Sequence, residues 1–340
     1  MSSASVSPAT TTTSWTPLAV LATAQFLVVL STSIVNVALP ELRAALGLGP
    51  AGLSWVVNAY VLAFGSLLLL GGRSGDVYGL RRVFLTGTGL FAASSLGAAL
   101  AGDLVTLVVA RAGQGVGAAL LAPTALAMVL TLFRDGPRRG TALGVWGAVS
   151  GGGGAAGVLL GGLLGGAYGW RSVFWVMVPL AVAVLVATWR LLPADRPRGG
   201  RLDLPGALTV TLGLTALAYG MSGNVWPAVA AGLLLLGLFL HLQRRSADPL
   251  VPGRILRAGS VGAANVLMAL LGAVWLGLFF FLPLHQQRVL GYTPMETGLT
   301  QLPLALTITL ASWATPRLAR RLSARVVLAG GLVLHAAGLA

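Results

Sequence analysis

Long apolar segments alternate with short polar ones along almost the whole chain of 340 residues. A helix needs about 20 apolar residues to cross the hydrocarbon core of a bilayer, and ten segments reach roughly that length. These predicted spans are residues 17–39, 52–72, 83–101, 104–131, 140–166, 172–192, 204–222, 226–243, 260–284 and 297–316. An eleventh apolar segment begins near residue 326. The pattern predicts an all-α integral membrane protein, a bundle of about ten full transmembrane helices with a partial eleventh.

The positions of the arginines predict how these spans are oriented. The loops after the second, fourth, sixth, eighth and tenth spans hold most of them, for example Arg81 and Arg82. The loops on the opposite side hold only Arg43, Arg171 and Arg288. Loops rich in arginine stay in the cytoplasm. We therefore expect the N-terminus and the even-numbered loops to be cytoplasmic.

The same pattern divides the chain into units. A linker rich in Pro, Gly and Arg separates the sixth span from the seventh, and a weak repeat between residues 72–87 and 315–330 favours two related halves. The predicted units are a disordered N-terminal tail (1–16), a six-helix bundle (17–192), a cytoplasmic linker (193–203), two inserted helices (204–243), a cytoplasmic loop (244–259) and an incomplete C-terminal bundle (260–340).

Composition narrows the class of protein further. Only 9% of the residues are charged and the mean hydropathy is +0.88, whereas about a quarter of the residues are charged in a soluble domain. The net charge of +14 comes from short arginine clusters between apolar runs, which argues against nucleic-acid binding. The chain has no cysteine, no metal-ligand spacing and no Walker-type phosphate loop. We expect no metal, no cofactor and no enzyme activity.

Glycines, arginines and one acid recur in the loop after the second span, GGRSGDVYGLRR. The glycines permit a tight turn and close approach of helices, and a carboxylate at a helix end can pair with arginines. A loop that only followed the positive-inside rule would not need the acid. We interpret this loop as a cytoplasmic gate formed by Gly72, Arg73, Asp76, Gly79, Arg81 and Arg82.

Polar residues inside two spans indicate a cavity. Arg111 in the fourth span is costly to bury unless it faces a cavity or finds a partner, and Gln114 lies on the same helical face. Snorkelling of Arg111 to the outer interface is the alternative. In the first span, Ser31, Thr32 and Asn36 can face a cavity or bind a neighbouring helix. We therefore expect these five residues to form a proton and substrate cavity.

The fifth span contains a dense run of glycines, GVWGAVSGGGGAAGVLLGG. Glycine weakens a helix, so this density is expected where the helix must approach another backbone closely or bend. Close packing of small residues without any further role is the alternative. The predicted hinge consists of Gly144, Gly153, Gly157, Gly161 and Gly162.

Together these segments resemble the major facilitator superfamily, and within it the fourteen-span drug:proton antiporters. The gate loop is similar to the superfamily's cytoplasmic motif, Arg111 and Gln114 to its span-4 motif, and the glycines of the fifth span to the antiporter motif. Val158 stands where that motif has proline, and Ser31 stands where an acid is usual in the first span. The chain resembles a member of that family that is truncated at its C-terminus.

The resemblance implies a multi-pass protein of a bacterial plasma membrane that works by alternating access. It would expel amphipathic, often cationic, small molecules in exchange for protons. The gate loop would latch the cytoplasmic side, the glycines would let the fifth span bend, and Arg111 would tune proton binding. Because no acid lies well inside a predicted span, an uncoupled exporter of a neutral metabolite stays open, as does a truncated remnant that does not transport.

Overall fold

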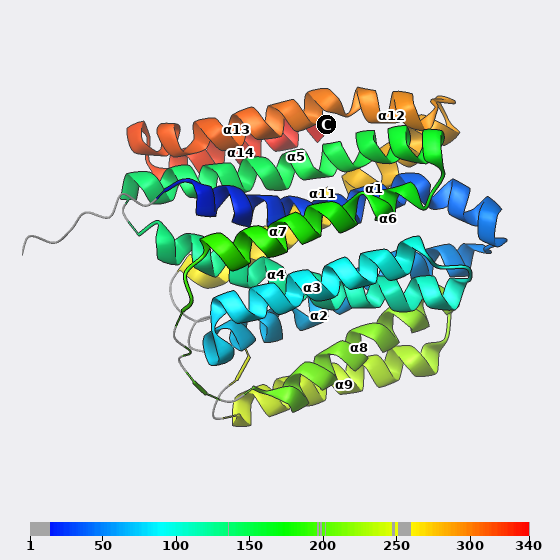
Figure 1. The fold of residues 1–340 in the computed structure, drawn as a ribbon, viewed down its shortest axis with the longest axis horizontal. Coiled ribbons are helices and arrows are strands. Elements are labelled where there is room, and N and C mark those ends of the chain that lie inside the picture. Colours follow the sequence, from blue (N-terminus) through cyan, green and yellow to red (C-terminus); the bar gives the residue numbers. More distant parts are fainter. Residues whose placement is uncertain are drawn as a thin grey trace, which may run out of the picture.

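The structure is a computed structural model that describes residues 14–134, 136–195, 197, 199–200, 202–246, 249–250 and 260–339. The predicted tail up to residue 13 and residues 251–259 of the predicted loop lie outside the described residues. Helices make up nearly all of the described chain (Figure 1): α1 (Thr16–Leu46), α2 (Pro50–Tyr78), α3 (Leu80–Ala99), α4 (Leu104–Leu132), α5 (Gly136–Tyr168), α6 (Ser172–Trp175), α7 (Met177–Leu191), α8 (Leu204–Gly223), α9 (Trp226–Arg245), α11 (Ser260–Arg288), α12 (Pro294–Thr300), α13 (Leu302–Arg321) and α14 (Ala324–Leu339).

The all-helical membrane fold predicted from the apolar segments is confirmed. Among the described residues, seven helices are long and apolar enough to cross a membrane. The full number of spans and their orientation stay predictions.

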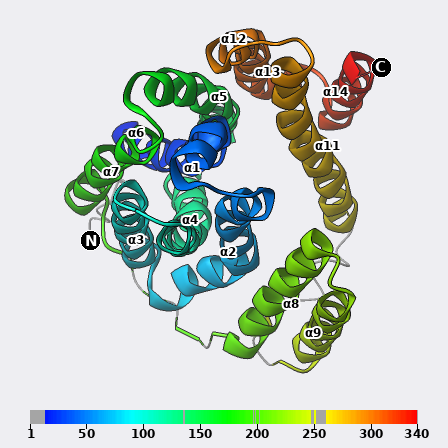
Figure 2. The ribbon, with the colours of Figure 1, turned by 90° about the vertical axis from the view of Figure 1, so that its right-hand side faces the viewer.

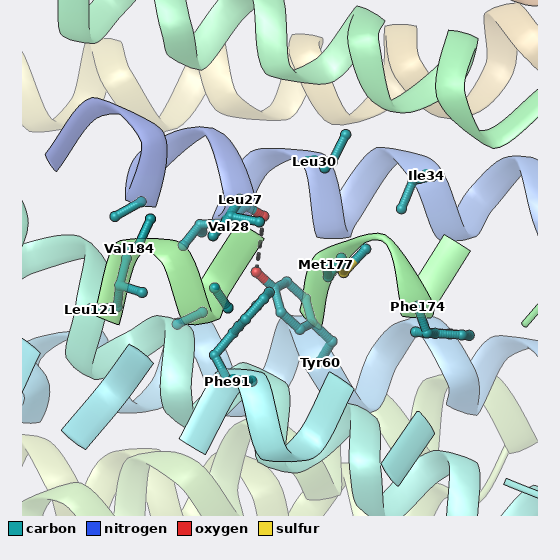
Figure 3. Close-up of a cluster of buried hydrophobic side chains, with 14 of the residues drawn as sticks. Leu27, Val28, Leu30, Ile34, Tyr60, Phe91, Leu121, Phe174, Met177 and Val184 are labelled. Atoms are coloured by element: carbon teal, nitrogen blue, oxygen red, sulfur yellow. Dashed lines mark hydrogen bonds between the residues drawn. The ribbon is translucent and has the colours of Figure 1, made fainter. Parts of the chain in front are cut away.

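Helices α1 to α7 form one bundle, with α1 and α4 surrounded by the others (Figure 2). Helix α4 packs along both α2 and α3, and α1 packs along α5. Large apolar side chains such as Ile34, Phe84, Phe91 and Phe174 are fully buried between them. Figure 3 shows part of this cluster, in which α1, α2, α3, α4 and α7 all contribute side chains.

Several helix boundaries differ from the predicted spans, and α2 for example continues to Tyr78 instead of ending near residue 72. Helix α1 continues through Pro40 and ends at Leu46, where Gly47 adopts a left-handed conformation with φ of +63° and donates its N–H to the Arg43 carbonyl. That left-handed glycine is a common helix terminator. The predicted sixth span is two helices separated by Val176, and the tenth is two helices separated by Gln301. Both separating residues keep helical backbone angles, so the chain continues in one direction.

The remaining helices are arranged more openly. Helices α8 and α9 form a hairpin that packs mainly on itself and touches α2, where the rings of Trp55 and Tyr219 lie 6.3 Å apart. Helix α11 runs between this hairpin and α12 (Figure 2), α13 packs along α5, and α14 contacts α13. The contact between α13 and α5 therefore joins the last part of the chain to the first bundle.

Candidate transport site

Arg111 lies in the middle of the first bundle and only 1% of its surface is exposed. Its Nε donates to the Val56 carbonyl at 3.0 Å, and its Nη1 donates to Ser31 Oγ at 3.1 Å and to Gln114 Oε1 at 3.0 Å. Helices α1, α2 and α4 thus meet on one guanidinium. The prediction that Arg111 is buried is confirmed, and the snorkelling alternative is wrong.

An aromatic ring covers the same guanidinium. The Arg111 Cζ lies 4.4 Å from the centroid of the Tyr60 ring, a position in which the ring quadrupole attracts the cation. The Tyr60 hydroxyl points toward α1 and donates to the Val28 carbonyl at 3.0 Å (Figure 3). The ring is thereby held in place over Arg111.

Gln114 extends the network across the bundle. Its Nε2 donates to Ser95 Oγ at 2.8 Å and contacts Met177 Sδ at 3.7 Å, which adds α3 and α7 to the group. The hydrogen-bond partners named for Arg111 are all uncharged, so carbonyl and hydroxyl dipoles and the Tyr60 ring compensate its charge. Hydrogen bonds from an ionised donor are stronger than neutral ones. The arrangement therefore stabilises a permanent positive charge without a carboxylate.

The structure brings together three of the five predicted cavity residues. Ser31, Arg111 and Gln114 are buried and hydrogen-bonded to one another through Arg111. Thr32 is half-buried and donates to the same Val28 carbonyl that accepts from Tyr60, at 3.1 Å. Asn36 is exposed, one turn further along α1. The five residues therefore divide into a closed network and a more open face.

The segment predicted as a gate loop is mostly helical. Gly72, Arg73 and Asp76 lie in the last turns of α2, Arg81 and Arg82 lie in the first turn of α3, and Gly79 alone separates the two helices at what we call the gate turn. Gly79 has φ of +99°, a conformation that favours glycine, and its N–H donates to the Gly75 carbonyl at 3.0 Å. Gly72 lies against Pro123 of α4, since a Cβ there would be 3.6 Å from Pro123 Cβ. Arg73, Asp76 and Arg81 are half-buried and Arg82 is exposed.

Asp195, which follows α7, contacts this turn, and its role was not predicted from the sequence. Its carboxylate accepts from the backbone N–H of Leu80 at 2.5 Å and of Arg81 at 3.0 Å, and Arg81 Nη2 donates to the Trp189 carbonyl at 2.6 Å. A carboxylate at the first N–H groups of a helix satisfies them and complements the helix dipole. The end of the first bundle is thereby fastened to the gate turn. Its position as an acid directly beside the arginines of the linker was the signal that could have revealed it.

The glycines of α5 contact two different helices. A Cβ added at Gly157 would lie 2.6 Å from Ser33 Cβ, and one at Gly161 would lie 2.9 Å from the Ile34 carbonyl oxygen, both in α1. On another side of α5, a Cβ at Gly144 would lie 3.2 Å from Pro316 of α13. Gly153 also faces α1, through Val29, and Gly162 is half-buried.

Helix α5 is continuous from Gly136 to Tyr168. Val158 is buried within it. A proline at that position would remove a backbone hydrogen bond and kink the helix, so valine is compatible with the unbroken helix. In this conformation the glycines form contact surfaces on an unbroken helix.

A cavity of about 750 Å³ lies between α1, α5 and α13. Its lining residues are Phe26, Thr141, Gly144, Val145, Ala148, Val149, Gly152, Leu310, Trp313, Pro316 and Arg317. Drug-sized ligands occupy pockets of about 300–1,000 Å³ that are mostly apolar with a few polar groups. None of the five predicted cavity residues is in this lining. The cavity lies instead along the N-terminal half of α5 and the C-terminal half of α13.

Comparison with known proteins agrees with this architecture. The chain is 46% identical to the cephamycin export protein CmcT of Amycolatopsis lactamdurans, over 96% of this chain and 70% of that protein. It is 44% identical to the puromycin resistance protein pur8 of Streptomyces alboniger, over 96% of this chain and 67% of that protein. The chain thus spans about two thirds of the length of these curated relatives.

Solved structures show the same fold. The proton:xylose symporter XylE matches with a TM-score of 0.61 at 16% identity, over 90% of this chain and 69% of that one. A peptide transporter POT in complex with sulfate matches with a TM-score of 0.60, also at 16% identity. The sequence pattern described for the Major Facilitator Superfamily matches residues 21–340. The chain therefore belongs to the major facilitator superfamily.

Proposed function

We propose that this chain exports amphipathic small molecules across a bacterial plasma membrane as a secondary transporter that works by alternating access. The observation that carries the proposal is the cavity between α1 and α5 of the first bundle and α13 of the last part of the chain. Alternating access requires a binding site between two bodies that can rock against each other. The names of two relatives, an export protein for cephamycin and a resistance protein for puromycin, support the export of drug-like compounds.

The fourteen-span drug:proton antiporters are the branch in which we place it. That branch has two extra helices between its bundles, and the α8–α9 hairpin has the corresponding position in the chain. The hairpin packs mainly on itself. This limited contact suits an insertion that leaves the two bundles free to move.

The turn between α2 and α3 is proposed as the cytoplasmic gate. Gly72, Arg73, Asp76, Gly79, Arg81 and Arg82 would form it, and Asp195 would hold it to the end of α7. The glycine surfaces of α5 would let α5 shift against α1 and α13 without large side chains interlocking. Thr32 and Asn36 would line the substrate route on α1, next to the Arg111 network.

Proton exchange is the coupling implied by the family resemblance, with Arg111 tuning proton binding. Uncoupled export is a second candidate, and Ser31 is the observation that favours it. Its hydroxyl accepts from Arg111 where the family has an acid, and a hydroxyl does not titrate near neutral pH. The acids that the structure describes lie toward helix ends, at Glu41, Asp76, Asp103, Asp195, Asp203 and Glu296.

Export is tested by expressing the chain in a bacterium that lacks its main efflux pumps. The measurement is accumulation of puromycin, a cephamycin and ethidium. The chain should lower the accumulation of at least one compound severalfold. Gly157→Leu should abolish this effect because α1 leaves no room at Gly157, whereas Gly237→Leu, where nothing lies within 4 Å, should retain it. Unchanged accumulation of all three compounds would overturn the proposal.

Coupling is tested with the same protein in vesicles. A proton antiporter should lose export when a protonophore collapses the pH gradient. Export that persists after collapse of the pH gradient would favour the uncoupled route. Ser31→Asp then tests the role of the missing acid, since it should introduce a pH dependence that Ser33→Asp does not.

A further inference from the structure

The lining of the cavity between α1, α5 and α13 is mostly apolar and carries a positive charge. Phe26, Val145, Val149 and Leu310 make most of its wall apolar. Among the residues that the structure describes, Arg317 is the one charged residue in the lining, and none of the lining residues is acidic. A charged ligand that enters this cavity therefore meets a single fixed charge, and that charge is positive.

Arg317 is held in place by the residue one turn before it. Its Cζ lies 3.7 Å from the centroid of the Trp313 ring, and its Nη1 donates to the Trp313 carbonyl at 2.9 Å. A guanidinium fixed by a ring and a carbonyl loses less freedom when it binds an anion than a free side chain would. The flat Trp313 ring also offers a stacking surface beside the charge.

Further arginines lie near the end of the cavity, where α5 begins and α13 ends. Arg138 and Arg139 are exposed in the first turns of α5, and Arg321 is exposed in the last turn of α13. These two helix ends are adjacent, since a Cβ at Gly140 would lie 3.8 Å from Pro316 Cβ. A mouth lined by charges of one sign raises the local concentration of ligands of the opposite sign.

We infer that this cavity selects amphipathic organic anions, molecules with an apolar ring system and one carboxylate or sulfonate, over cations of the same shape. The acid group pairs with Arg317 and the ring stacks near Trp313 and Phe26. A cation in the same place would lose water of hydration without gaining a partner and would face Arg317 directly. This inference rests on the proposed export function, because it names the substrate class of the same cavity.

The test uses two probes that share one ring and differ in charge, 2-naphthalenesulfonate and (2-naphthyl)trimethylammonium. The purified full chain is placed in nanodiscs of neutral lipid, and Kd is measured by equilibrium dialysis against empty nanodiscs. The sulfonate should bind at least about tenfold more tightly than the ammonium, the ratio expected from one charge-assisted contact of about 1.4 kcal/mol.

Variants then assign the selectivity to one side chain. Arg317→Gln should weaken sulfonate binding about tenfold, whereas Arg317→Lys should retain most of it. Arg244→Gln in α9 is the matched control because it removes the same exposed charge from a helix that does not contribute to the lining; it should change Kd less than twofold. Helical content and the elution profile of each variant show that it is folded.

Several results would overturn the inference: equal or tighter binding of the ammonium, no saturable binding of either probe, or a folded Arg317→Gln variant with unchanged sulfonate affinity. Failure here is distinguishable from failure of the export proposal. Export of cationic compounds alone would overturn the anion selectivity and leave export standing. If the chain binds anions selectively but lowers the accumulation of no compound, the export proposal is overturned and the anion selectivity stands.

Discussion

The bundle of α1 to α7 and the helices from α8 onward are both built from apolar segments, yet they pack very differently. In the first bundle the core includes Tyr60, Phe84, Phe91 and Phe174 and surrounds Arg111. Among the described residues beyond Leu192, the buried apolar side chains are Ala207 and Leu250. Large side chains in α13 and α14, such as Trp313 and Leu334, are mostly exposed.

This difference teaches that hydropathy determines whether a segment is a membrane helix but not how it packs. Lipid tails are as apolar as leucine, so small residues and polar contacts decide which helices associate. Gly157 meets α1 and Gly232 meets α8, whereas Gly272 and Gly277 of α11 have nothing within 4 Å of a Cβ position. Glycine produces close packing only where a partner backbone lies opposite it.

The strongest test of the comparison is removal of the buried arginine. Arg111→Ala leaves Ser31, Gln114 and the Val56 carbonyl without their donor and creates a cavity. We expect a loss of about 3 kcal/mol or more in the free energy of unfolding, since each orphaned buried group costs about 1–3 kcal/mol. The exposed Arg244→Ala in α9 should change it by less than about 0.5 kcal/mol. Urea or SDS unfolding of both variants gives the comparison, and equal effects would contradict it.

Glycine substitutions should have opposite signs in the two regions. A Cβ at Gly71 would lie 1.9 Å from the Ala119 carbonyl oxygen, so Gly71→Ala should force α2 and α4 apart at a cost of about 1–3 kcal/mol. Gly237→Ala in α9 meets open space and should stabilise its helix by up to about 1 kcal/mol. Melting temperatures in detergent would show a decrease for the first and an increase for the second. A decrease for both would show that α9 has a partner.

Two of the helix-capping aspartates give a smaller contrast. Asp195 caps α3 from a distant part of the chain, whereas Asp203 caps its own helix α8, accepting from the Gly206 N–H at 2.9 Å. Either change to alanine should cost about 1 kcal/mol. Only Asp195→Ala should also loosen the gate turn, seen as faster hydrogen exchange at the Leu80 and Arg81 amides. Faster exchange there in Asp203→Ala would contradict a separate role for Asp195.

The smallest expected effect depends on pH. Hydrogen bonds from Thr106 lower the pKa of Asp103, and those from Thr293 lower the pKa of Glu296. A carboxyl whose pKa is lower in the folded state adds stability above its unfolded pKa, and this stability is lost as the pH falls through the folded pKa. The melting temperatures of Asp103→Asn and Glu296→Gln should therefore lie below that of the wild type at pH 7, and the differences should shrink steadily as the pH falls below the pKa of the unfolded carboxyls. Differences that stay constant with pH would contradict the assignment to ionisation.

The apolar segments were sufficient to predict the helices, because a run of about 20 apolar residues has few alternatives in a membrane. The spacing of Arg111 and Gln114 likewise predicted their contact, since residues three apart share a helical face. Both features depend on local sequence.

Features that depend on distant partners could not be predicted. Asp195 contacts the start of α3, which lies more than a hundred residues earlier in the chain. The linker sequence alone does not predict that contact. The sequence also could not predict that α5 contacts two helices, because a run of glycines does not indicate that Gly144 packs against α13 and Gly157 against α1. The cavity was expected around Arg111, but the network there closes on itself and the open space lies beside Arg317.

The position of the acids toward helix ends has an electrical consequence. A chain that carries no ionisable acid through the membrane interior can still drive export if its cargo is negatively charged. The interior of a bacterial cell is electrically negative, and moving one elementary charge through 100 mV is worth about 2.3 kcal/mol. That energy corresponds to a concentration ratio of about fiftyfold for a monovalent anion. For such a cargo the membrane voltage itself supplies the driving force, and depolarising the cell would stop export even at constant pH.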